Sequence, residues 1–196
     1  NALPASNADA TLRDCCDADR WINQVAAQRP FESADALYAA GDAAWRKMDR
    51  ADILEAFSHH PQIGQKPDSG SEAHRRWSMG EQAAAQVAPE DMKARLARKN
   101  RAYFEKFGYM FIVCATGKTA EEMLALLDER LQNDAARELP IAAEQHWLIM
   151  RLRLEKLPPA GVSVVLMIAA VAPYTLASLA LRNFSWHSLG AIAALA

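Results

Sequence analysis

The sequence lacks the features that mark several large classes of protein. With 22 basic and 24 acidic residues its formal net charge is -2, so there is no basic excess to bind nucleic acid or an anionic membrane surface. Its three cysteines are too few and too unevenly spaced for a disulfide framework or a zinc site, which favours a reducing, cytosolic compartment. It has no Gly-rich phosphate loop, dinucleotide fingerprint or internal repeat, which argues against a nucleotide cofactor.

The charged residues divide the chain of 196 residues into two parts. Only one of them, Arg182, lies beyond Lys156, and 51% of all residues are apolar, which is enough for one core. We therefore expect a single domain over residues 1–157, followed by an apolar tail, 158–196, whose origin the sequence leaves open. The first residues, 1–11, carry neither the basic region nor the apolar run of a secretory signal.

Residues 162–181 of the tail are uncharged and have the nominal length of a membrane-spanning helix. Against an anchor stand Pro173 in the middle of the segment and its many alanines, which insert only marginally into a membrane. The alternatives are a buried or partner-covered segment and a tail that is not native to the domain. We favour a domain that works without a membrane. The alternative is a domain tethered to a membrane through residues 162–181.

Helix signals follow one another through residues 1–157, which predicts an all-α, single-domain multi-helix bundle. Only Tyr109–Ala115 is strand-like, and one strand without a partner forms no sheet, so we expect a buried connection there. Gly108 is expected to end the helix before it. The expected helical segments are 33–47, a short one beginning at Asp52, 71–87, 90–107, one capped by Thr119 and Glu122, and 134–157.

A His-His-Pro turn is the first candidate site. His59 and His60 follow an apolar helix end, and Pro61 forces the residue before it into an extended conformation. His60 is therefore presented on a rigid loop, and a free imidazole has a pKa of about 6.5, which suits proton transfer near neutral pH. Two histidines exposed in a loop or capping the helix would give the same pattern.

Two helical patterns are the other candidates. Ser78, Glu81 and Gln82 stand at i, i+3 and i+4, so one helix face carries a hydroxyl, a carboxylate and an amide, unless this is an ordinary solvated face. Arg151 and Arg153 point about 200° apart on a helix, so at most one faces a buried site, where it could bind a carboxylate. An exposed Arg paired with a nearby acid is the simpler alternative.

These patterns, taken together and in order, resemble the 2-oxo-4-hydroxy-4-carboxy-5-ureidoimidazoline (OHCU) decarboxylase family. The resemblance covers nearly all of residues 1–157 and excludes the tail. The segments that carry it are Arg29-Pro30-Phe31, His60 to Gly64, Ser78 with Glu81-Gln82, Asn100 with Tyr103, Phe107 to Lys118, Arg130-Leu131 with Asn133-Asp134, and Arg153-Leu154.

The resemblance implies a cofactor-independent decarboxylase that converts OHCU to (S)-allantoin in urate degradation. It implies an all-helical homodimer without a metal ion, and the unfused domain favours a cytoplasmic location. The implied catalytic residues are His60 for proton transfer, Glu81, and Arg153 in preference to Arg151. The implied substrate-binding residues are Pro61, Ser78, Gln82, Phe111, Ile112, Val113, Cys114 and Ala115, the last five through the main chain.

Two questions stay open at this point. The residues do not decide whether His60 begins the reaction as an acid or as a base. A non-catalytic helical module that binds a ureide, tethered or not through 162–181, would carry many of the same residues.

Overall fold

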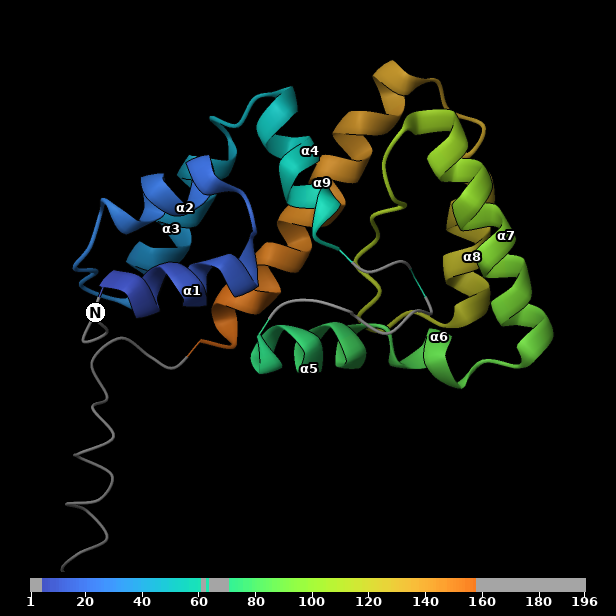
Figure 1. Cartoon of the computed structure of the whole chain (residues 1–196), viewed down its shortest axis with the longest axis horizontal. Coiled ribbons are helices and arrows are strands. Elements are labelled where there is room, and N and C mark those ends of the chain that lie inside the picture. The colour runs from blue at the N-terminus through green and yellow to red at the C-terminus, as the bar shows by residue number, and fades with distance from the viewer. Residues whose placement is uncertain (1–4, 61–62, 64–70, 158–196) are drawn as a thin grey trace, which may run out of the picture. The chain divides into compact units, whose positions relative to one another are not determined.

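A computed structural model describes residues 5–60, 63 and 71–157, and every regular element within them is an α helix (Figure 1). The prediction of an all-α fold is confirmed. The helices are α1 (Ala5–Cys15), α2 (Asp19–Ala26), α3 (Ala34–Trp45), α4 (Arg50–Ser58), α5 (Glu72–Glu81), α6 (Ala83–Val87), α7 (Glu90–Phe107), α8 (Ala120–Arg130) and α9 (Ala135–Glu155). The tail with its 162–181 segment lies outside the described residues, and no helix within them is long and apolar enough to cross a membrane.

Side-chain caps fix most of the helix starts where the sequence predicts them. Ser33, Ser71 and Asp134 each accept a hydrogen bond from a backbone N–H in the first turn of α3, α5 and α9. Thr119 and Glu122 form the expected capping box of α8. Gly108 ends α7 in the left-handed conformation, with φ of 79°.

Two of the predicted helix boundaries are wrong. The helix expected from Asp52 begins two residues earlier at Arg50, because Asp49 is its N-cap and Asp52 is the third residue of its capping box. The segment expected over 71–87 is two helices, because Gln82 leaves the helical conformation between α5 and α6, with φ of -107° and ψ of 16°.

Helix α9 contributes to both hydrophobic clusters of the fold. On one side Met150 and Leu154 pack with the buried side chains of α1 to α4, including Trp21. On the other, Ala142 and Ile149 pack with α7, α8 and the connection between them. Figure 1 shows α9, in orange, running past both groups of helices. One helix therefore positions the residues that lie between the two clusters.

The strand-like run 109–115 is a largely buried connection without regular structure, as predicted. A buried polar network holds it. Arg130 donates to the Ile112 carbonyl at 2.7 Å, and its guanidinium forms an ion pair with Glu138. Glu138 also accepts a hydrogen bond from the Tyr103 hydroxyl. These groups satisfy one another in the core, where an unpaired charge would be costly. The network fixes the backbone of the connection beside α9.

Candidate active site

A small cavity of about 20 Å³, room for about one water molecule, lies where α4, α5, α9 and the 109–115 connection meet. Its lining combines ionisable groups with apolar side chains from segments far apart in the sequence. The residues are His60, Ile63, Glu81, Gln82, Phe111, Ile112, Val113, Ala115, Thr116, Ile149 and Arg153.

Arg153 is the charged centre of this cavity. Its side chain is buried, and its guanidinium donates to both oxygens of Glu81, at 3.2 and 2.9 Å. It also donates to Ser78 Oγ at 3.0 Å and to the Asp14 carbonyl at 3.1 Å. A forked cation with this many fixed acceptors has one orientation, so the positive charge is in place before any ligand binds.

Glu81 is held as a carboxylate. Burial disfavours its charge, but hydrogen bonds and charge from Arg153 and Lys156 outweigh that effect and lower its pKa below the ordinary value. Lys156 Nζ lies 2.9 Å from one oxygen of Glu81. The site therefore holds the Arg153 guanidinium beside the ionised carboxylate of Glu81.

His60 faces the cavity with its ring edge-to-face against His146, at a centroid distance of 4.8 Å. Burial, followed by the nearby imidazole of His146 and the charge of Arg153, lowers the pKa of His60 well below 6.5. The pKa of a free imidazole therefore does not carry over to His60, because the fold places these groups around the ring. At neutral pH His60 is an uncharged imidazole.

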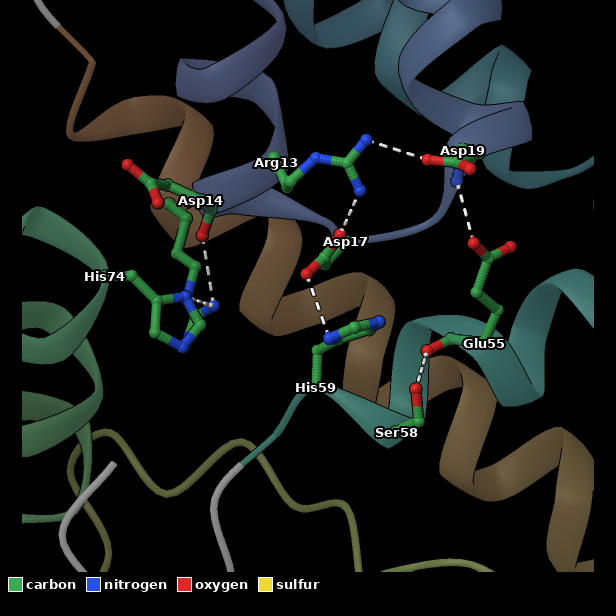
Figure 2. Close-up of polar contacts among 9 residues, drawn as sticks. Arg13, Asp14, Asp17, Asp19, Glu55, Ser58, His59 and His74 are labelled. Atoms are coloured by element: carbon green, nitrogen blue, oxygen red, sulfur yellow. Dashed lines mark hydrogen bonds and ion pairs between the residues drawn. The ribbon is translucent and has the colours of Figure 1, made fainter. Parts of the chain in front are cut away.

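His59 turns away from the cavity. Its Nδ1 lies 3.0 Å from Asp17 in the connection between α1 and α2, and Asp17 also pairs with Arg13 (Figure 2). The two adjacent histidines therefore diverge, and of the two only His60 lines the cavity.

Arg151 and Arg153 also diverge, as their spacing on α9 predicts. Arg151 pairs with Asp42 of α3 and stands over the rings of Tyr38 and Trp147. Arg153 points into the cavity. The structure thus separates an Arg at the helix packing interface from an Arg at the site.

Two of the predicted binding residues do not line the cavity, and one lies outside the described residues. Ser78 is buried behind the cavity, where it holds Arg153. Cys114 is turned away, because its N–H donates to Gln145 Oε1 at 3.0 Å and its carbonyl accepts from Lys118 at 2.8 Å. Pro61 is the residue outside the described part.

Several residues around the cavity were not predicted. The ring of His74 is buried with Nδ1 3.5 Å from Arg153, and its pKa is lowered by burial and by that charge. His146, Ile149 and Thr116 were not predicted as site residues either. Two signals existed: Thr116 lies in the 107–118 segment that carries the resemblance, and Ile149 stands four residues before Arg153 on α9 and so shares its face.

The arrangement suits an anionic ligand with amide groups. A fixed guanidinium supplies positive charge to a carboxylate or carbonyl oxygen, a carboxylate can accept from N–H groups, and a neutral imidazole can accept a proton. Within residues 5–60 and 71–157 no three His, Cys, Asp or Glu side chains come together as metal ligands.

Comparisons with known proteins agree on one family. The family model for OHCU decarboxylase matches residues 1–155. The chain is 39% identical over 145 residues to the uric acid degradation bifunctional protein TTL of Arabidopsis thaliana, covering 73% of this chain but only 45% of that protein. It is 27% identical over 139 residues to the OHCU decarboxylase of Haloferax volcanii, covering 68% of this chain and 79% of that one.

A solved structure gives the same result for the fold. The structure of OHCU decarboxylase in the presence of (S)-allantoin superposes with a TM-score of 0.65 and 32% identity, covering 75% of this chain and 96% of the other.

Proposed function

We propose that this chain, which belongs to the OHCU decarboxylase family, converts OHCU to (S)-allantoin in urate degradation without an added cofactor. The observation that carries the proposal is the convergence of His60, Glu81 and Arg153 on one cavity. These groups come from α9, from the end of α5 and from the residue after the α4 C-cap, so only the fold unites them.

The proposed mechanism uses the substrate's own conjugated C=N group as the electron sink. As CO₂ leaves, the electron pair of the broken C–C bond forms a ring C=C bond, and the C=N pair moves onto the ring nitrogen, which takes a proton from water. The neutral His60 accepts the proton of the substrate hydroxyl and returns it to the ring carbon on one face, which fixes the S configuration. His60 thus begins as a base, in accordance with its lowered pKa.

Arg153 and Glu81 are proposed to orient the substrate. The fixed guanidinium offers positive charge to an oxygen of the substrate, and Glu81 accepts from its ring or ureido N–H groups. Gln82, beside Glu81, is proposed to add an amide contact, while Ser78 acts by holding Arg153. Main-chain groups of the 111–115 segment, apart from those of Cys114, which Gln145 and Lys118 occupy, are proposed to bind the ureido arm.

The test is turnover by the full chain. Urate oxidase and hydroxyisourate hydrolase generate OHCU from urate, and circular dichroism follows the optical activity of allantoin. His60→Ala should lower kcat by about 10²–10⁴-fold, whereas His59→Ala, which changes the neighbouring imidazole, should keep activity within about threefold because His59 points to Asp17. Racemic product at the spontaneous rate from the folded wild-type chain would refute the proposal.

The two arginines of α9 provide a second pair of variants. Arg153→Ala should raise KM and lower kcat, because the buried Glu81 loses its partner and the substrate loses its cation. Arg151→Ala should change stability more than turnover, since it removes the pair with Asp42. The opposite ranking would mean that the wrong arginine has been placed in the mechanism.

We further propose that residues 1–157 form the catalytic unit and that the protein acts as a cytoplasmic homodimer. Support comes from the family resemblance, the match over residues 1–155 and the three free, buried cysteines. Sedimentation of the full chain should give twice the mass of 21.6 kDa.

A further inference from the structure

One face of α9 carries three residues at intervals of four, which are Gln145, Ile149 and Arg153. Ile149 and Arg153 line the cavity. Gln145, one turn earlier, instead reaches the 109–115 connection, where its Oε1 accepts the Cys114 N–H at 3.0 Å. The helix that carries the guanidinium thus also holds the backbone opposite it.

Cys114 is held on both sides, through two different peptide groups. Gln145 holds the Val113–Cys114 peptide through the Cys114 N–H, and Lys118 Nζ holds the Cys114–Ala115 peptide by donating to the Cys114 carbonyl at 2.8 Å. Two residues earlier, the Ile112 carbonyl accepts from Arg130. The polar groups of Cys114 are therefore used within the protein and are not offered to a ligand.

Its two neighbours have the opposite environment. Val113 and Ala115 line the cavity, whereas Cys114 between them does not. In the described part of the chain the N–H groups of Val113 and Ala115 make no hydrogen bond. Since buried backbone groups rarely stay unpaired, these N–H groups are suited to a ligand that presents carbonyl oxygens.

We propose that Gln145 is a positioning residue, which holds the Val113–Cys114 peptide against α9 and thereby fixes the spacing and relative orientation of the Val113 and Ala115 N–H groups that bind a ureide on either side of it. The inference rests on the proposed function for the identity of the ligand. It assigns to Gln145 no contact with the substrate.

The physical consequence concerns binding more than chemistry. Without the Gln145 oxygen, the buried Cys114 N–H has no acceptor, and the peptide must rotate to find one. Because this peptide links the Val113 and Ala115 N–H groups, its movement would change their spacing and relative orientation. Because His60, Glu81 and Arg153 would stay in place, KM should rise by about tenfold while kcat changes by less than about threefold.

Three variants of the full chain test the inference. Gln145→Met removes the amide acceptor at similar length, Gln145→Glu keeps an oxygen acceptor, and Glu144→Met is the matched control at the adjacent exposed position. Each is assayed for KM and kcat, for the Kd of (S)-allantoin by calorimetry, and for hydrogen exchange at the Cys114 amide. Gln145→Asn, whose amide is one methylene too short to reach, replaces Gln145→Met if that variant does not fold.

We expect Gln145→Met to raise KM and Kd by about tenfold and to speed Cys114 exchange by a similar factor, with Gln145→Glu and Glu144→Met close to wild type. If KM, Kd and Cys114 exchange in Gln145→Met equal those of the wild type, the inference is overturned. It is also overturned if Gln145→Glu raises KM and Kd as much as Gln145→Met does. If the wild-type chain binds allantoin but does not convert OHCU, the proposed function fails, and the Kd and exchange results still decide the role of Gln145.

Discussion

Replacing His146 by Phe should make the protein more stable. The His146 ring is completely buried and stacks on Trp45 at a centroid distance of 4.7 Å and an interplanar angle of 9°. Both of its ring nitrogens are buried, and among the residues that the structure describes neither has a hydrogen-bond partner. Phenylalanine keeps an aromatic ring in the stack and removes both polar atoms.

The expected gain is the difference between two opposing effects. Each unpaired buried polar group costs about 1–3 kcal/mol, and the larger ring costs about 1–3 kcal/mol in a packed core. The net gain should be about 2 kcal/mol at pH 7. For a domain of about 150 residues this corresponds to a rise in Tm of about 4–8 °C.

Urea and thermal unfolding, followed by circular dichroism at pH 7, measure this change. His146→Ala is the control, since it removes the same nitrogens but also the stack on Trp45, and it should be less stable than wild type. A Tm of His146→Phe at or below the wild-type value would refute the reasoning, because it would mean that the nitrogens stabilise the fold.

Stability should also fall in acid. The pKa values of three histidines are lowered in the folded state, chiefly by burial: those of His60, His74 and His146, the last to about 3. As the pH drops below about 6.5, these histidines therefore bind protons in the unfolded chain before they do so in the folded one. The free energy of unfolding should decrease between pH 7 and pH 5 by up to about 1.4 kcal/mol per pH unit per histidine. Urea unfolding at several pH values measures this slope, which should be shallower in His146→Phe. A wild-type stability that does not change with pH would contradict the pKa directions. Gly41→Ala should destabilise the protein by about 1–3 kcal/mol, because the new Cβ would lie 2.9 Å from Leu154 Cδ1. An unchanged midpoint of urea unfolding would show instead that the Leu154 side chain moves aside at no cost.

The features that could be predicted from the sequence depend on residues close together along the chain. The caps at Ser33 and Thr119 act within one turn, so their signals are visible in four residues. The choice between Arg151 and Arg153 needed only the helical repeat and the family pattern.

The features that could not be predicted depend on contacts between distant segments. The lowered pKa of His60 results from burial and from His146 and Arg153, which lie 86 and 93 residues further along the chain. The Asp14 carbonyl that holds Arg153 belongs to the backbone, and any residue type could supply it. The break at Gln82 follows Gly80 by two residues, but an isolated Gly is tolerated within a helix and no Pro marks the break, so the sequence of 71–87 looks like one helix.

The place of α9 in both hydrophobic clusters couples the site to the cooperativity of the whole fold. A helix shared between two clusters cannot detach from one without disturbing its packing in the other. The contacts that Gln145, Ile149 and Arg153 make should therefore break only when the whole domain unfolds. In hydrogen exchange, the central amides of α9 should open with the same free energy as global unfolding, so that every folded molecule keeps Arg153 in place.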